Sequence, residues 1–173
     1  TIGLISNTHP AFGELIQWVA MAFGLPFENR EEVALYDSFV NFLIEEYARG
    51  MRTILIVDEA QNMSADTLEE LRVLSNINAD KNLVLQIILV GQPELRDTLR
   101  KPCLEQFAQR ISVDYHLDPL DARETRDYIE HRLLKAGGDK GLFSRPAILL
   151  IHEYSAGVSR IINSLCDTAM VYA

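Results

Sequence analysis

Short apolar runs alternate along the chain with stretches in which apolar residues recur at helical spacing. Residues 2–6 form an apolar run with β-branched side chains, which predicts a buried strand. Asn7, Thr8 and Pro10 interrupt this run and open a helix, which Gly24 ends. The apolar stripe predicted for that helix consists of Phe12, Leu15, Ile16, Val19 and Phe23.

A second amphipathic stretch predicts a helix over residues 31–49, which Gly50 ends. The side chains expected to face the core from that helix are Val33, Phe39, Phe42, Leu43 and Tyr47. Residues 54–57 then form a continuous apolar run, which is too short for a helix and typical of a parallel strand covered on both faces. Ser64 is the expected N-cap of the next helix, with Asp66 in its first turn.

Two more segments complete the predicted sheet. Residues 83–90 form the longest apolar run and predict a central strand, which Gly91 and Pro93 end. Residues 111–117 alternate between apolar and polar side chains, and this period of two predicts a half-exposed edge strand.

The pattern changes after Pro119, where three helical segments follow without a further strand. Asp121 and Glu124 form an expected capping box at the start of the first of these helices, and Ser144 caps the second. Strands that alternate with helices, followed by helices alone, predict an α/β core over residues 1–118 and a small helical domain over residues 119–173.

The composition fits a folded domain and limits its partners. Of the 173 residues, 48% are apolar and 24% are charged, which excludes a disordered chain. The net charge is −9, and because an acidic surface repels phosphates, we expect no direct binding to nucleic acid or anionic membranes. No apolar run reaches the ~18 residues that a membrane-spanning helix needs. Two distant cysteines, Cys103 and Cys166, suit a reducing compartment such as the cytoplasm.

Two acidic residues, Asp58 and Glu59, follow the predicted strand of residues 54–57 directly. Ligand sites in open α/β sheets lie at the carboxyl ends of the strands. A carboxylate at that place can hold Mg²⁺ through water, and a second one can orient or deprotonate a water for attack on a phosphoryl group. The alternative is that Asp58 caps a turn and Glu59 is merely solvated.

Three further polar residues stand where they could join such a site. Gln92 ends the strand of residues 83–90 and could bind an attacking water or a phosphate, or satisfy backbone groups of its own turn. Arg110 could reach a phosphate in a neighbouring subunit, or form an ordinary surface ion pair. Arg160 opens the last helix, where the helix dipole disfavours a cation, and this favours a role toward a ligand.

Three stretches carry a resemblance to a known family: IVDEAQN at residues 56–62, LEELRVLSN at residues 68–76 and LVGQPEL at residues 89–95. They resemble the AAA+ ATPases of the general secretion pathway protein A type, and related ATPases of pilus-biogenesis and exopolysaccharide loci are similar. The sequences QRI, YHL and INSLCD at residues 109–111, 115–117 and 162–167 extend the resemblance over essentially the whole chain.

The resemblance implies a role for each candidate residue. Asp58 and Glu59 correspond to the Walker B pair, in which Asp58 binds Mg²⁺ and Glu59 activates water. Gln92 corresponds to sensor 1, Arg110 to the arginine finger and Arg160 to sensor 2 in the helical lid. The chain departs from the family at residue 159, where serine replaces the usual proline before that arginine.

The sequence contains no Gly-x-x-x-x-Gly-Lys-Ser/Thr, the loop that surrounds the phosphates of ATP. The resemblance therefore implies a P-loop NTPase core of three layers that lacks its first strand and its P-loop, together with a helical lid. The family's sheet order is 5-1-4-3-2, so the strand of residues 83–90 is expected to have an unpaired edge and residues 111–117 to be poorly anchored. This piece alone is expected neither to bind ATP tightly nor to hydrolyse it.

The resemblance predicts that the complete protein hydrolyses ATP with Mg²⁺ to drive assembly of a secretion or envelope machine, as an oligomer with partner proteins. It would work in the cytoplasm or at the cytoplasmic face of the inner membrane. Two alternatives remain: a DNA-associated ATPase regulator of the transposition kind, against which the net charge of −9 argues, and a non-catalytic interaction module that has lost its P-loop.

Overall fold

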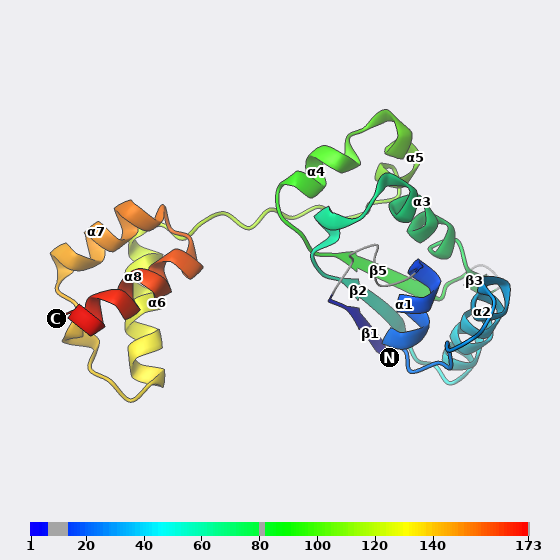
Figure 1. Ribbon diagram of the computed structural model, residues 1–173, viewed down its shortest axis with the longest axis horizontal. Helices are drawn as coiled ribbons and strands as arrows, with labels where there is room; N and C mark the ends of the chain where they lie inside the picture. The colour runs from blue at the N-terminus through cyan, green and yellow to red at the C-terminus, as the bar shows by residue number, and fades with distance from the viewer. Residues whose placement is uncertain (7–13, 80–81, 173) are drawn as a thin grey trace. The chain divides into compact units, whose positions relative to one another are not determined.

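The computed structural model describes residues 1–6, 14–79 and 82–172 of the chain. The chain divides into two compact units, Thr1–Val113 and Asp114–Ala173 (Figure 1). All strands of the described residues lie in the first unit, and the second unit is helical.

Three parallel strands form the sheet of the first unit (Figure 1). They are β1 (Ile2–Ile5), β2 (Thr53–Val57) and β5 (Leu85–Leu89), in the order β1-β2-β5. This order agrees with the expectation from the family resemblance, and within the described residues β5 has a strand on one side only. The predicted strand of residues 83–90 is divided in two, because β4 (Asn82–Leu83) pairs instead with β3 (Asn78–Ala79) in an antiparallel ribbon.

The helices of the first unit pack on one face of the sheet. The longer ones are α1 (Leu15–Ala22), α2 (Glu32–Ala48) and α3 (Ala65–Leu74). Shorter turns are η2 (Ala60–Asn62), α4 (Glu94–Leu99), η3 (Pro102–Leu104) and α5 (Glu105–Ala108). The predicted opening of the first helix, including Phe12, lies outside the described residues. Ser64 caps α3 as predicted, since its Oγ accepts a hydrogen bond from the Thr67 amide at 3.1 Å.

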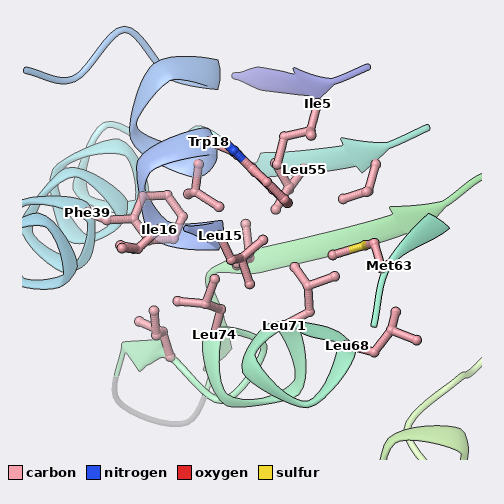
Figure 2. Close-up of a cluster of buried hydrophobic side chains, with 14 of the residues drawn as sticks. Ile5, Leu15, Ile16, Trp18, Phe39, Leu55, Met63, Leu68, Leu71 and Leu74 are labelled. Atoms are coloured by element: carbon pink, nitrogen blue, oxygen red, sulfur yellow. The ribbon is translucent and has the colours of Figure 1, made fainter. Parts of the chain in front are cut away.

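The core of this unit forms where those helices meet β1 and β2 (Figure 2). Figure 2 shows Trp18 of α1 beside Ile5 and Leu55 on the inner face of the sheet, and Leu71 of α3 belongs to the same buried cluster. Leu55 is fully buried, and Trp18 is 5% exposed. Burying such side chains contributes about 1.5–3 kcal/mol each, so this face holds the unit together.

The opposite face of the sheet is open within the described residues. Leu4, Ile56 and Ile88 stand side by side across the three strands. Leu4 is 58% and Ile88 47% exposed, and Ile2 at the start of β1 is 65% exposed. A parallel sheet is normally covered on both faces, so an apolar face left open is a departure from the usual architecture.

The predicted inner face of α2 is partly wrong. Phe39 and Leu43 are fully buried as expected, but Val33 is 79% exposed and Tyr47 38% exposed. Leu35, which the sequence analysis did not select, is fully buried instead. Residues 35, 39 and 43 are spaced four apart and so form one continuous stripe, whereas Val33 lies outside it.

The predicted edge strand of residues 111–117 is also wrong. No strand forms there, and Val113, Tyr115 and Leu117 are each at least 80% exposed. A strand needs a neighbour to accept and donate its backbone hydrogen bonds, and alternation of side chains does not supply one. The described residues offer this segment no strand to pair with, in keeping with the expectation that it is poorly anchored.

The second unit consists of α6 (Ala122–Lys135), η4 (Lys140–Leu142), α7 (Arg145–Ser155) and α8 (Ser159–Tyr172). The predicted caps are present: Asp121 and Glu124 form a reciprocal capping box, and Ser144 caps α7. The buried residues that hold these helices together are Ile129, Ile148, Ile151, Ile162 and Cys166. Both cysteines, Cys103 and Cys166, are free thiols. None of the helices in the described part of the chain is long and apolar enough to cross a membrane.

Candidate functional site

Asp58 and Glu59 occupy the turn at the carboxyl end of β2, as the sequence predicts. The Asp58 amide donates to the Ile5 carbonyl at 2.8 Å, which extends the pairing of β1 and β2 by one residue. The Asp58 Oδ1 accepts from the Glu59 amide at 2.8 Å. Asp58 is half-buried and Glu59 is exposed, so the two carboxylates differ in their access to solvent.

Glu59 has left-handed backbone geometry, with φ 53° and ψ 33°. A residue with a Cβ rarely adopts this conformation, and holding one there costs on the order of 1–2 kcal/mol. Such strain persists only where the surrounding structure imposes it, and strained residues cluster at functional sites. The backbone at Glu59 therefore marks the turn independently of its acidic side chains.

The Asp58–Glu59 turn is joined to the end of β5 by backbone hydrogen bonds. The Val90 amide donates to the Val57 carbonyl at 2.8 Å, and the Ala60 amide donates to the Val90 carbonyl at 2.9 Å. The carboxyl ends of β2 and β5 thus meet at one rim of the sheet. Open α/β sheets bind their ligands at this rim.

Gln61 links the two strand ends through its side chain. Its Nε2 donates to Glu59 Oε2 at 2.6 Å, and its Oε1 accepts from the backbone amide of Gln92 at 3.1 Å. The Gln92 side chain itself is exposed. The structure thus brings Asp58, Glu59 and Gln92 to one place.

Gln61 and the close approach of Gly91 are functional features that the sequence patterns did not predict. A Cβ added at Gly91 would lie 2.8 Å from Gln61 Oε1 and 3.3 Å from the Gln61 amide nitrogen. Gly91 was assigned only to ending a strand. The available signal was an amide side chain two residues beyond Glu59, since an amide carries both a donor and an acceptor.

Arg110 lies apart from this turn, beside the last turn of α3. Its guanidinium donates to Ser75 Oγ at 3.5 Å, just beyond the end of that helix. The Arg110 guanidinium thus lies at the end of α3, whereas the Asp58–Glu59 turn comes before its beginning, and the ten residues of this helix span about 15 Å.

Arg160 lies in the second unit. It occupies the first turn of α8, as predicted, and it is exposed. Its helix is fixed within that unit through Ile162, which is fully buried.

The side chains at the rim can be compared with the ligands that Mg²⁺ prefers in proteins. No group of three or more His, Cys, Asp and Glu side chains that could hold a metal occurs in the part of the chain that the structure describes. Mg²⁺ does not require one, because it keeps several waters and binds through one or two carboxylates together with substrate phosphates. The half-buried Asp58 carboxylate fits this mode of binding.

Comparison with known proteins gives a consistent family. The model of the AAA domain matches residues 4–99. The chain is 37% identical over 173 residues to the general secretion pathway protein A of Aeromonas hydrophila. That match covers 99% of this chain and 32% of the relative, so the chain spans about a third of that protein's length.

Two solved structures share the fold. The ORC2 protein of Aeropyrum pernix, in ADPNP–ADP complexes, has a TM-score of 0.57 and 17% identity over 97% of this chain and 52% of its own. Cdc6p of Pyrobaculum aerophilum has a TM-score of 0.58 and 18% identity over 87% of this chain and 40% of its own.

Proposed function

The chain belongs to the AAA domain family, and from that membership we propose that it supplies the catalytic carboxylates and the helical lid of an AAA+ ATPase. The complete protein binds ATP and Mg²⁺ and cleaves the bond between the β- and γ-phosphates. The single observation that carries this proposal is the strained Asp58–Glu59 turn at the carboxyl end of β2, joined to Gln92 at the end of β5.

Each candidate residue, at the rim and in the lid, has a proposed role in this reaction. Asp58 would hold Mg²⁺, most simply through water, and the bound ion would supply neutralisation of phosphate charge. Glu59 accepts a proton from the attacking water, because a carboxylate is a competent general base. Gln92 contacts the attacking water or the terminal phosphate with its exposed amide. Arg160 reaches the nucleotide from the lid, where a guanidinium can bind phosphate through two hydrogen bonds.

The phosphate cradle itself comes from another part of the longer protein. The 173 residues contain no Walker A sequence, and the relative from Aeromonas hydrophila is about three times as long as the match. Two features of the sheet, as far as the described residues form it, support a missing neighbour: the unpaired edge of β5 and the open face at Leu4 and Ile88. A strand beside β5 and a helix over that face would complete the sheet. This chain alone is therefore inactive.

Arg110 acts on the nucleotide of a neighbouring copy. Its position at the opposite end of α3 from the Asp58–Glu59 turn supports this assignment, because the guanidinium then cannot serve its own Asp58–Glu59 turn. The active form is thus an oligomer whose sites lie between subunits. By analogy with the relative's name, the ATPase cycle drives assembly of a secretion or envelope machine through partner proteins, at the cytoplasmic side where ATP is available.

Turnover of ATP by the full-length protein tests the proposal. Glu59→Gln is expected to lower kcat at least ~100-fold while ATP still binds, since a general base contributes roughly that much. Glu153→Gln makes the same chemical change on an exposed position of α7 and is the matched control, with turnover unchanged. Equal turnover of Glu59→Gln and wild type would refute the role of Glu59. A full-length protein without Mg-ATP turnover would favour the non-catalytic interaction module.

Mixing two inactive variants tests the assignment of Arg110. Arg110→Ala and Glu59→Gln are each expected to be inactive as pure oligomers. In an equal mixture, about one quarter of the subunit interfaces combine an intact Glu59 from one copy with an intact Arg110 from the next. Activity should therefore return to about one quarter of the wild-type value. No recovery, with mixed oligomers verified, would contradict action between subunits.

A further inference from the structure

Gln61 is the side chain that joins the two functional strand ends. It is half-buried and makes one hydrogen bond in each direction: as a donor to the Glu59 carboxylate at 2.6 Å and as an acceptor from the Gln92 amide at 3.1 Å. The first distance is short for a hydrogen bond from a nitrogen donor.

We propose that Gln61 is a positioning residue, which orients the Glu59 carboxylate and couples it to the backbone of Gln92. This inference rests on the proposed ATPase function. Gln61 does not touch the substrate in this role. It acts through Glu59, whose proton-accepting oxygen must be held within hydrogen-bond distance of the attacking water.

The two partners of Gln61 fix the orientation of its amide. An ionised carboxylate accepts hydrogen bonds only, so the NH₂ group must face Glu59. A backbone amide donates only, so the oxygen must face Gln92. A flip of the amide would lose both bonds at once, and the carboxylate and the Gln92 amide therefore share one rigid connector.

The connector makes Gln92 and Glu59 move together. Gln92 lies three residues beyond the end of β5, and its exposed side chain is proposed to contact the terminal phosphate or the attacking water. Any shift of its backbone moves the acceptor oxygen of Gln61 and hence the donor that holds Glu59. The state of the phosphate is thus transmitted to the carboxylate through two hydrogen bonds.

Gly91 leaves the space that the connector needs. Its φ lies outside the left-handed region, so glycine is not required there by the backbone. A Cβ at this position would instead meet Gln61 Oε1 at 2.8 Å and force the amide away from the Gln92 nitrogen. Gly91→Ala is therefore a second, independent way to break the connector without changing Gln61.

Steady-state ATP hydrolysis by the full-length protein tests the inference. Gln61→Met keeps the length of the side chain and removes both hydrogen bonds. Gln61→Glu keeps an acceptor for Gln92 and places a second carboxylate against Glu59. Asn62→Asp is the matched control, because it makes the same amide-to-carboxylate change at the next residue, whose exposed side chain lies outside the connector.

The expected effect is on kcat and not on the KM for ATP. Gln61→Met and Gly91→Ala should lower kcat at least ~10-fold, and Gln61→Glu more, with KM within about twofold of wild type. Asn62→Asp should leave both constants unchanged. A merely structural role would instead lower the unfolding midpoint or change KM. Unchanged kcat in Gln61→Met would overturn the inference.

A double-mutant cycle separates this inference from the proposed function. If Gln61 acts through Glu59, Gln61→Met should cause no further loss in a Glu59→Gln protein. Full additivity of the two losses would overturn the coupling. If Glu59→Gln itself leaves turnover unchanged, the proposed function fails. If Glu59→Gln abolishes turnover and Gln61→Met does not lower kcat, only the positioning role fails.

Discussion

Because the backbone at Glu59 is left-handed, we expect glycine to be more stable than alanine at this position, which is the reverse of their order inside a helix. Glu59→Gly and Glu59→Ala remove the same side chain and the same hydrogen bond to Gln61. They differ in that alanine must still hold a Cβ at φ 53°, whereas glycine adopts this conformation freely. We therefore expect Glu59→Gly to be the more stable of the two variants.

The expected difference in unfolding free energy between Glu59→Gly and Glu59→Ala follows from two opposing effects. The left-handed conformation costs a residue with a Cβ roughly 1–2 kcal/mol. Glycine loses about 0.5–1 kcal/mol more conformational entropy on folding than alanine does. The difference leaves Glu59→Gly more stable than Glu59→Ala by about 1 kcal/mol.

Urea unfolding of the 173-residue chain, followed by tryptophan fluorescence, measures this difference. Trp18 is the single tryptophan of the sequence and lies buried beside β1 and β2, so its emission reports on the first unit. With a urea dependence of roughly 2 kcal/mol per molar, 1 kcal/mol corresponds to a midpoint shift of about 0.5 M.

An ordinary helical position provides the control. Ala34 lies in the first turn of α2 and is exposed, and Ala34→Gly should lower stability by up to about 1 kcal/mol. Glycine is thus expected to be the better residue at position 59 and the worse one at position 34. Should Glu59→Ala equal or exceed Glu59→Gly in stability, the reasoning that strain is stored in this turn is wrong.

Three other sets of substitutions test the lid, the open sheet face and the charges of the first unit. Gly157→Ala should cost about 2–5 kcal/mol in helix unfolding by circular dichroism, because its Cβ would lie 2.0 Å from the Leu120 carbonyl oxygen at φ +77°. Gly137→Ala, with open space at φ +80°, should cost about 1 kcal/mol. Ile88→Ser should change the unfolding free energy of the 173-residue chain by less than about 0.5 kcal/mol, but lower that of the full-length protein by about 2 kcal/mol. Burial, with neighbouring carboxylates adding to it, raises the pKa of Glu70 above its ordinary value of 4.5, so its stabilising protonated form is lost as pH rises. Glu70→Gln should therefore raise the unfolding free energy at pH 7 and not at pH 4, by only a few tenths of a kcal/mol because solvent screens the exposed carboxylate.

Local rules predicted those features that local sequence controls. Ser64 and Ser144 cap their helices because a side-chain oxygen can reach the amide three residues ahead, whatever lies beyond. Asp58 and Glu59 were found because a buried run that ends in carboxylates needs only the strand itself to place them at a rim. The order β1-β2-β5, in contrast, came from the family resemblance and not from any pattern of residues.

Features that depend on a distant partner could not be predicted in this way. The alternation at residues 111–117 is real, but the described residues provide no strand to pair with it, and Tyr115 is 80% exposed. Leu35 replaces Val33 in the core because the rotation of α2 is set by what it packs against. Both errors have the same cause: periodicity describes one segment, and burial depends on its neighbour.

Gln61 shows the same dependence at the site itself. Its amide two residues after Glu59 is visible in the sequence, but its second partner appears only when β5 runs beside β2 and brings the Gln92 amide within 3.1 Å. Gln61 Nε2 bonds to the carboxylate of the residue with the strained backbone, Glu59, and Gly91 leaves the space for the Gln61 Oε1 that accepts from the Gln92 amide. The strained backbone at Glu59, the Gln61 connector and Gly91 are thus parts of one arrangement. A substitution that relieves the strain but keeps a carboxylate is therefore expected to gain stability at the expense of the alignment on which turnover depends.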